Sequence, residues 1–372
     1  MGLKMKYGFE RKFRDQVLRC SSCGFCQAVC PIFGLTFRPA LNARGKMLVL
    51  QEVMDGDAEL NQELIETLFQ CTTCANCSTN CPSGVSVPDI IKEARKDMVA
   101  AGVGHPAFIG MNEALKMRHN IYGEEEPEDF ERERNRKADY VYFIGCVGSF
   151  RENETTMETL DLLDRLKVDY TLIDEVCCSG VLEDVGYRIN RELINRNIEM
   201  ILSTGAGKVI TGCPYCFRTF NDDRFYKGLR DAGVKVLHIS QFLKDFDFEV
   251  ISDKVVTYHD PCDLGRHCGI YDEPRETITK IAPNFVEMCH TRADALCCGA
   301  GGGVRGAYPA NSIAMARRRL DEVEQIGAQV VLTECNSCLH NLANAKLRSQ
   351  KFSIYTTAQF INMLMMTEID KE

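Results

Sequence analysis

The sequence has no tryptophan, no run of about 18 apolar residues and no apolar segment near its first residue. The missing tryptophan excludes no fold, but the missing apolar run excludes a helix that crosses a bilayer, so we expect no membrane span. The first residues, MGLKMKYGFERKF, do not resemble a secretory signal, and Lys6 stands where N-myristoylation needs Ser or Thr. We therefore expect a cytoplasmic protein, and any association with a membrane is expected to come through a partner.

Nucleotide-binding motifs are also missing. The chain contains no GxGxxG phrase after a strand and no GxxxxGK[ST] phrase, so it carries no built-in site for a dinucleotide or for ATP. Its 44 Lys and Arg residues against 53 Asp and Glu residues give a net charge of −9, which disfavours binding to nucleic acid. Because flavin and nicotinamide motifs are absent, we expect the chain to work as one subunit of a complex.

Cysteine is the residue that the chain has in excess, with 20 among 372 residues. The rest of the composition, 45% hydrophobic and 26% charged, is ordinary for a soluble protein of two or three domains. Disulfide-rich secreted proteins are usually short and follow a signal peptide. We therefore expect these thiols to be held by metal rather than oxidised.

Eight of the cysteines form two copies of one phrase, Cys-x2-Cys-x2-Cys-x3-Cys-Pro, at residues 20–31 and 71–82. Three thiolates at this spacing can bind three corners of a [4Fe–4S] cubane, and the fourth, before proline, usually binds the other cluster of the pair. Structural zinc prefers two separated cysteine pairs and fits this spacing poorly. The expected ligands are Cys20, Cys23, Cys26 and Cys81 for the first cluster, and Cys71, Cys74, Cys77 and Cys30 for the second.

The chain divides into a helical segment and two similar halves of mixed α/β pattern. Residues 1–122 hold both ferredoxin phrases, and the apolar periodicity between them predicts helix. Residues 123–137 are densely charged and fit either a solvated linker or an exposed helix with ion pairs. In residues 138–250 and 251–372, short β-rich runs (140–145, 170–173 and 208–211, then 255–258, 285–288 and 329–333) alternate with helical patterns. This alternation predicts parallel βα units, with cysteines at the strand ends where ligands bind in open sheets.

Each half carries five cysteines in the order C, CC and CxxC. Five ligands are too many for tetrahedral zinc, whereas adjacent cysteines suit a thiolate that bridges two irons beside one that binds a single iron. Gly299 and Gly301 belong to a glycine run that we interpret as backbone clearance around a cluster. Cys268 and Cys289 belong to neither phrase and are expected to pack in the interior. The two sets of five are Cys146, Cys177, Cys178, Cys213 and Cys216, and Cys262, Cys297, Cys298, Cys335 and Cys338.

The phrases Tyr-His-Asp-Pro-Cys at 258–262 and Cys-Cys-Gly-Ala-Gly-Gly-Gly-Val at 297–304 resemble the heterodisulfide reductase D family, which is similar to a fusion of the heterodisulfide reductase C and B proteins. Relatives of that family include iron–sulfur subunits of glycolate, D-lactate and glycerol-3-phosphate dehydrogenases. The resemblance implies α/β architecture with an N-terminal helical ferredoxin domain and two tandem Cys-Cys-Gly (CCG) repeats. It also implies one or two noncubane [4Fe–4S] clusters, each on five cysteines, which split a disulfide in one-electron steps.

Two positions depart from the family pattern. The first repeat reads Cys-Cys-Ser-Gly at 177–180, and Asp263 stands where family members often have a histidine that can donate a proton. His259 or His267 could supply that proton instead, or either ring could simply be hydrogen-bonded to the backbone. Arg266 and Arg305 could clamp an anionic substrate, or they could only offset cluster charge. The predicted catalytic group is Cys297, Cys298, His259 and Arg305, with Gly299 and Gly301 beside the cofactor.

Three functions remain open at this point. The chain could reduce a disulfide at the CCG clusters, or it could relay electrons from an FAD-linked glycolate- or D-lactate-type dehydrogenase. A scaffold that assembles or stores clusters is a third class, which the complete ligand sets disfavour. The implied partner is a flavoprotein subunit, either heterodisulfide reductase A-like or an FAD-linked dehydrogenase, or else a membrane cytochrome.

Overall fold

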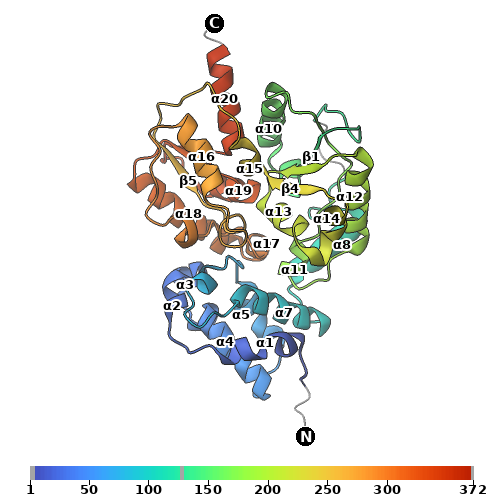
Figure 1. Cartoon of the computed structure of the whole chain (residues 1–372). Helices are drawn as coiled ribbons and strands as arrows, with labels where there is room; N and C mark the ends of the chain where they lie inside the picture. Colours follow the sequence, from blue (N-terminus) through green and yellow to red (C-terminus); the bar gives the residue numbers. More distant parts are fainter. Residues whose placement is uncertain (1–4, 126–129, 370–372) are drawn as a thin grey trace.

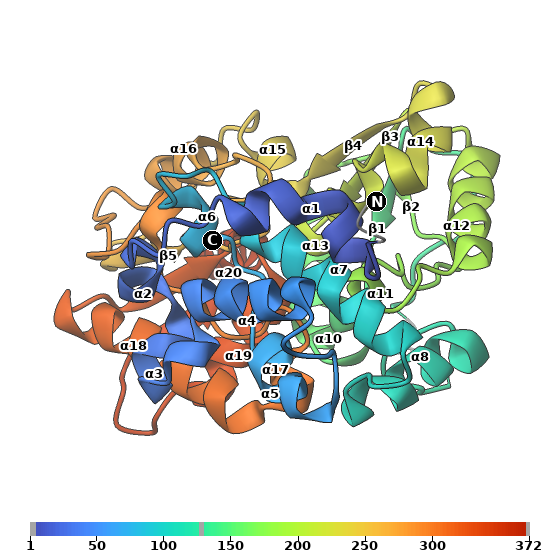
Figure 2. The same ribbon diagram turned by 90° about the horizontal axis from the view of Figure 1, so that it is seen from below.

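The computed structural model describes residues 5–125 and 130–369. A helical domain packs beneath two α/β units that lie side by side, and it extends across both when seen from below (Figures 1 and 2). Among the described residues, no helix is long and apolar enough to cross a bilayer. The predicted class, α/β with a helical N-terminal domain, is confirmed.

The helical domain is built around three amphipathic helices, α1 (Gly8–Leu18), α4 (Ala43–Asp55) and α7 (Val87–Ala100). Helix α4 begins after Asn42, whose side chain accepts a hydrogen bond from the Gly45 amide, and ends at Gly56 in the left-handed conformation. Its apolar side chains meet α1 and α7 in one core that contains Phe9, Leu50 and Ile90. The helices are α1 (Gly8–Leu18), α2 (Phe25–Val29), α3 (Pro31–Thr36), α4 (Ala43–Asp55), α5 (Ile65–Phe69), α6 (Asn76–Thr79), α7 (Val87–Ala100) and α8 (Pro106–Arg118).

The first α/β unit is a four-stranded parallel sheet in the order β2-β1-β3-β4. Its strands are β1 (Tyr140–Phe143), β2 (Tyr170–Thr171), β3 (Lys208–Thr211) and β4 (Lys235–His238). Its helices are α9 (Cys146–Phe150), α10 (Asn153–Arg165), α11 (Val181–Asp184), α12 (Arg191–Thr204), α13 (Pro214–Phe220), α14 (Asp223–Asp231) and α15 (Ile239–Leu243).

The second unit is a three-stranded parallel sheet in the order β5-β6-β7. The register repeats between units, because Phe143 pairs with Thr211 on β1 and β3, and His259 pairs with Thr333 on β5 and β6. Its strands are β5 (Val256–His259), β6 (Val330–Thr333) and β7 (Ser353–Tyr355). Its helices are α16 (Asp272–Ile281), α17 (Val304–Ala307), α18 (Pro309–Gln325), α19 (Asn336–Ala345) and α20 (Thr357–Ile369).

The two sheets share one apolar core, which includes Tyr142, Ile210, Tyr258 and Leu332. The last helix, α20, packs against α10 of the first unit rather than only against its own sheet. Helix α20 therefore contacts both units and holds them together.

Some sequence expectations about strands were wrong. Residues 285–288 form no strand, because only Phe285 makes an isolated bridge, to Val256, before the chain turns away. The edge strands β4 and β7 were not predicted. β4 alternates between more exposed and buried residues, and the three residues of β7 are only half buried, so neither has the apolar run that marks the inner strands.

The charged segment 123–137 is described except for residues 126–129. Phe130 is buried in the shared core, and Arg134 bridges to Leu172 at the edge of the first sheet. Arg132 forms ion pairs with Asp161 and Asp164 of α10. The described part after residue 129 therefore packs as extended chain along the first unit, and it contains no helix. The domain boundaries themselves stay predictions.

Candidate metal centres

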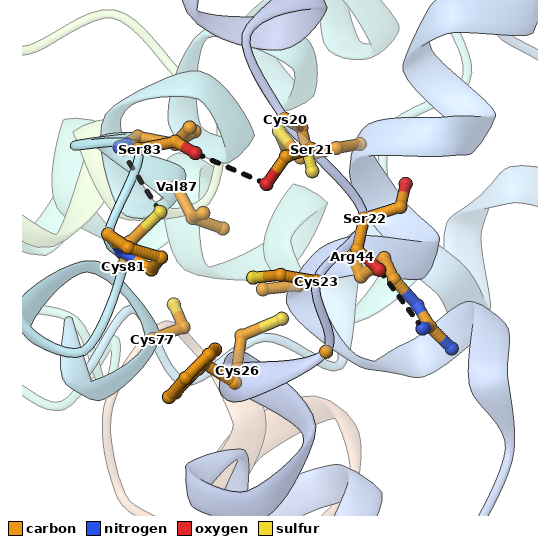
Figure 3. A pocket seen from close by; sticks show the side chains of 16 residues that line it. Cys20, Ser21, Ser22, Cys23, Cys26, Arg44, Cys77, Cys81, Ser83 and Val87 are labelled. Carbon is orange, nitrogen blue, oxygen red and sulfur yellow. Dashed lines mark hydrogen bonds between the residues drawn. The ribbon is translucent and has the colours of Figure 1, made fainter.

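One cavity of the helical domain brings together the first three cysteines of the first phrase and the last cysteine of the second. Figure 3 shows Cys20, Cys23, Cys26 and Cys81 around this cavity, which Cys77 also lines. The loops are held by a hydroxyl contact of 3.3 Å between Ser21 and Ser83. Another hydrogen bond, of 3.5 Å, runs from the Val85 amide to the Cys81 sulfur.

A second cavity brings together the reciprocal set. It is lined by Cys30 from the first phrase and by Cys71, Cys74 and Cys77 from the second. The buried ammonium of Lys46 also lines it, and burial lowers the pKa of this lysine while the nearby thiols oppose that effect. Burial raises the pKa of Cys30 to about 11, and the Lys46 charge opposes this effect. The grouping of cysteines in both cavities is the one that crossed ligation requires.

The two phrases follow the same backbone path. Ser22 and Thr73, each just before the second cysteine, both have φ of 54°. Gly24 and Ala75, each just after that cysteine, have φ of 89° and 64°. Left-handed backbone is uncommon outside glycine, so its repetition at matched positions indicates that the loop shape is imposed by the fold. This curl brings the three cysteines of each phrase around one cavity.

In the first α/β unit, the five predicted cysteines meet at the carboxyl ends of β1, β2 and β3. The Cys178 and Cys216 sulfurs lie 3.5 Å apart, and the Ser179 amide donates to the Cys177 sulfur over 3.4 Å. A Cβ at Gly145 would lie 3.1 Å from the Cys216 sulfur, so glycine is needed there. Contacts with Cys177 and Cys216 lower the pKa of Cys178 well below its usual range, and Cys146 contacts Cys177.

The second unit repeats this arrangement at the ends of β5 and β6. The Cys298 and Cys338 sulfurs lie 3.1 Å apart, and the Cys338 amide donates to Cys335 over 3.4 Å. Cys262 contacts Cys297, which accepts a further hydrogen bond of 3.4 Å from the Gly299 amide. Contacts with Cys297 and Cys338, aided by the ring of His259, lower the pKa of Cys298 well below its usual range.

The second ferredoxin loop lies directly against the second CCG site. The Cys297 sulfur is 3.7 Å from the Thr72 hydroxyl oxygen. Contact with Cys297 lowers the pKa of Cys74 well below its usual range, which places these two thiols side by side. Arg266 donates to the Cys74 carbonyl oxygen over 2.6 Å, and His267 meets the Thr73 carbonyl oxygen at 2.8 Å. The two predicted centres therefore share a boundary.

The glycine run makes this contact possible. A Cβ at Gly301 would lie 2.7 Å from the Thr72 carbonyl oxygen, and one at Gly302 would lie 2.8 Å from the Thr72 carbonyl carbon. A Cβ at Gly299 would lie 2.5 Å from the Ser312 carbonyl oxygen on α18. What these glycines clear is protein backbone, and their role as cofactor-binding residues stays a prediction.

The fully buried Arg95 joins all three parts of the chain and was missed by sequence reasoning. Its guanidinium donates to the carbonyl oxygens of Leu68 and Cys71, each at 2.8 Å, within the helical domain. It also donates to the carbonyl oxygen of Asp184 in the first unit at 2.5 Å and to that of Gly302 in the second at 3.0 Å. A hydrogen bond to a charged group contributes about 1.5–3 kcal/mol, so Arg95 contributes strongly to holding the three parts of the chain together.

Asp263 occupies the position where the family often has histidine, and it is engaged in an ion pair. Arg218 of the first unit lies 2.6 Å from its carboxylate and 3.7 Å from that of Asp184. Lys92 of α7 completes the group at 2.7 Å from Asp184. Burial opposes ionisation of Asp184, yet the two cations outweigh it and lower the pKa of the carboxyl group.

The remaining predicted residues fall in different surroundings. Arg305 donates to the Tyr122 hydroxyl over 3.1 Å, and its Nη1 has no hydrogen-bond partner among the described residues. Cys268 is half buried against the core of the first unit, and burial raises its pKa to about 12. Cys289 is exposed, so the expectation that it packs in the interior was wrong. It follows Met288 in a surface loop, where no pattern in the sequence distinguishes it from a core cysteine.

Known protein families match both parts of the chain. A family model for the 4Fe-4S dicluster domain matches residues 16–85, and the model for the cysteine-rich CCG domain matches residues 140–221 and 256–343. In solved structures, a hypothetical protein from Helicobacter pylori has a TM-score of 0.62 at 10% identity, covering 97% of this chain and 73% of that one. This likeness concerns the fold alone.

Curated relatives extend the match over most of the chain. The D component of the dihydromethanophenazine:CoB–CoM heterodisulfide reductase of Methanosarcina acetivorans is 30% identical over 361 residues, which is 88% of each chain. The B component of the fumarate reductase (CoM/CoB) of Methanothermobacter marburgensis is 29% identical, covering 73% of this chain and 56% of its own. The EtfAB:quinone oxidoreductase of Syntrophomonas wolfei is 23% identical over 87% and 54%. The chain therefore belongs to the heterodisulfide reductase D family, the iron–sulfur subunits of oxidoreductase complexes.

Proposed function

We propose that this chain passes electrons from two ferredoxin-type [4Fe–4S] cubanes to noncubane [4Fe–4S] clusters in its CCG repeats, where a disulfide is reduced. The cubanes are assigned to the crossed cysteine sets of the helical domain, and each noncubane cluster to the five cysteines of its repeat. Such clusters supply electrons one at a time, and conversion of one disulfide to two thiols consumes two electrons and two protons.

The observation that carries this proposal is the contact between Cys74 and Cys297. One cysteine belongs to the second ferredoxin phrase and the other to the second CCG phrase, and they meet with Thr72 in a buried interface. Arg266 holds that interface from the CCG side through the Cys74 carbonyl. These residues support a direct route from the helical domain into the second repeat.

Electrons are proposed to enter through the first phrase. Cys23 is exposed, and the neighbouring Phe25 is 63% exposed, so this end of the helical domain is open to a partner. The proposed partner is a flavoprotein subunit, either heterodisulfide reductase A-like or an FAD-linked dehydrogenase, or else a membrane cytochrome. The named relatives are components of complexes or larger oxidoreductases, which supports a partner of this kind.

The proposed substrate is an anionic disulfide. An open cavity beside Cys146 and Cys177 has a lining of mixed charge, with three arginines (Arg118, Arg134 and Arg196) and three acidic residues (Glu125, Asp174 and Glu175). Arg118 is paired with Glu125, so Arg134 and Arg196 are the guanidinium groups proposed to meet a carboxylate, phosphate or sulfonate group. Arg305 adds a guanidinium with one unpartnered nitrogen, and it donates a hydrogen bond to the hydroxyl of Tyr122.

A second candidate function is electron relay for an FAD-linked dehydrogenase. The ion pair between Asp263 and Arg218 favours it, because a carboxylate held in this way does not replace the proton-donating histidine of many family members. In this function the CCG clusters would pass electrons to a quinone or cytochrome and bind no disulfide.

A disulfide reductase assay on the wild type and on one variant separates the two functions. Cys298→Ala should abolish reduction of a small anionic disulfide by a viologen donor, while the reduced ferredoxin-domain EPR signals remain. The matched control is Cys268→Ala, which removes a thiol that belongs to none of the predicted ligand sets. If the wild-type protein shows no disulfide reductase activity but accepts electrons from a flavoprotein dehydrogenase, the relay function stands instead.

A further inference from the structure

His259 and Arg319 form a buried pair beside the second CCG site. Both side chains are essentially inaccessible, with 1% and 0% of their surface exposed. The Arg319 Nε lies 3.1 Å from the His259 Nδ1. Arg319 is fixed in turn by an ion pair with Glu322 and by a hydrogen bond of 2.7 Å to the His290 carbonyl oxygen.

This contact determines where the imidazole carries its proton. A guanidinium nitrogen only donates, so the His259 Nδ1 must accept, and the single N–H of the neutral ring is at Nε2. A doubly protonated ring would direct one N–H at another. The Nε2 atom is buried and has no hydrogen-bond partner among the described residues.

The free side of the ring faces sulfur. A ring nitrogen of His259 and the sulfurs of Cys298 and Cys338 lie within 4.8 Å of one another. Since Nδ1 is occupied by Arg319, Nε2 is the nitrogen left for these thiolates. The backbone that follows is fixed by Asp260, which accepts from the Arg275 Nη1 at 2.8 Å and Nη2 at 2.9 Å.

The first repeat has no such pair. Phe143 takes the place of His259, three residues before the first cysteine and in the same strand register. Asn197 takes the place of Arg319, sixteen residues before the CxxC phrase, and its amide bonds the backbone of Val176. The environments of the two CCG sites therefore differ by one oriented N–H donor.

We propose that Arg319 locks His259 as a hydrogen-bond donor to the thiolates of the second CCG cluster, so that this cluster has a higher reduction potential than the first. An N–H directed at a ligand sulfur stabilises the more negative, reduced state, and such hydrogen bonds are one determinant of cluster potential. His259 acts here as a tuning residue that keeps its proton. This inference rests on the proposed function, because it requires clusters in both repeats.

The test is a redox titration of the iron-loaded full chain, followed by EPR. His259→Phe, which introduces the residue found in the first repeat, should lower the reduction potential of the second CCG cluster by about 59 mV. For one electron, this makes transfer from the neighbouring cubane about tenfold less favourable. His259→Gln, which keeps an N–H donor, should recover part of the difference, and the cubane potentials should not change.

Arg319→Met combined with Glu322→Gln removes the lock without leaving an unpaired buried carboxylate, and it should lower the same potential. If His259→Phe loses iron, this double variant still tests the proposal. His290→Gln changes a partner of Glu322 but keeps the backbone carbonyl that Arg319 bonds, so it is the matched control and should behave as wild type. Unchanged potentials in a fully loaded His259→Phe protein would overturn this inference and leave the proposed function intact. Wild-type protein with empty CCG repeats would overturn both.

Discussion

The glycine contact between the second ferredoxin loop and the second CCG loop can be tested with one added methyl group. A Cβ at Gly302 would lie 2.8 Å from the Thr72 carbonyl carbon and 2.9 Å from its Cα. Carbon atoms pack best at about 3.5–4.0 Å, so Gly302→Ala should force these loops apart by about 0.7–1.2 Å. Gly302 also has φ of 60°, which adds about 1–2 kcal/mol of backbone strain for alanine.

Such a displacement should slow electron transfer between the two centres, because the rate of electron tunnelling falls steeply as the distance between donor and acceptor grows. The assay is rapid-freeze EPR after mixing reduced donor with the iron-loaded chain, following the rise of the CCG signal. Gly327→Ala is the control for strain, because Gly327 also has positive φ but nothing within 4 Å of an added Cβ. Gly306→Ala, in α17 just after this loop, is the control for an added methyl group nearby, since a Cβ there has no atom within 4 Å. An unchanged rate in Gly302→Ala would refute the proposed route.

Three further predictions follow from the contacts described above. Arg95→Leu should lower the free energy of unfolding by about 3 kcal/mol or more in denaturant titrations, because four backbone carbonyls lose a charged donor, and a loss below about 1 kcal/mol would contradict this. Cys81→Ser should alter the EPR signal of the cluster on the first phrase, and a change confined to the second cluster would show uncrossed ligation. Because its folded-state pKa is lowered, ionised Asp184 stabilises the fold fully above the ordinary carboxyl pKa of about 3.9, and this stability is lost progressively as the pH falls from there toward the folded-state pKa. Asp184→Asn should therefore be less stable at pH 7 and flatter in its acid stability profile, measured by unfolding from pH 7 to about pH 2.

The grouping of the cysteines and the architecture were accessible from sequence because each depends on local spacing. The ferredoxin phrases predict their curl from three cysteines within seven residues, and strands such as Val330–Thr333 carry continuous apolar runs. The relation between the domains was not accessible, because it depends on backbone surfaces. Nothing in the glycine run reveals that Gly301 and Gly302 lie against the backbone of Thr72.

The buried cations could have been noticed from helical periodicity. Arg95 falls on the same face of α7 as Ile91 and Met98, and Arg319 falls on the same face of α18 as Met315, all of them buried. A charge on an apolar face indicates a buried partner. The partners themselves, backbone carbonyls for Arg95, are set by tertiary packing and leave no mark in the sequence.

The iron and acid-labile sulfide content of anaerobically purified protein tests the central claim most directly. At four irons per cluster, the proposal predicts about sixteen irons per chain, or about twelve if only one CCG repeat is loaded. A content of about eight, with both ferredoxin-type EPR signals present, would show that the CCG repeats hold no cluster. That result would contradict the proposed function.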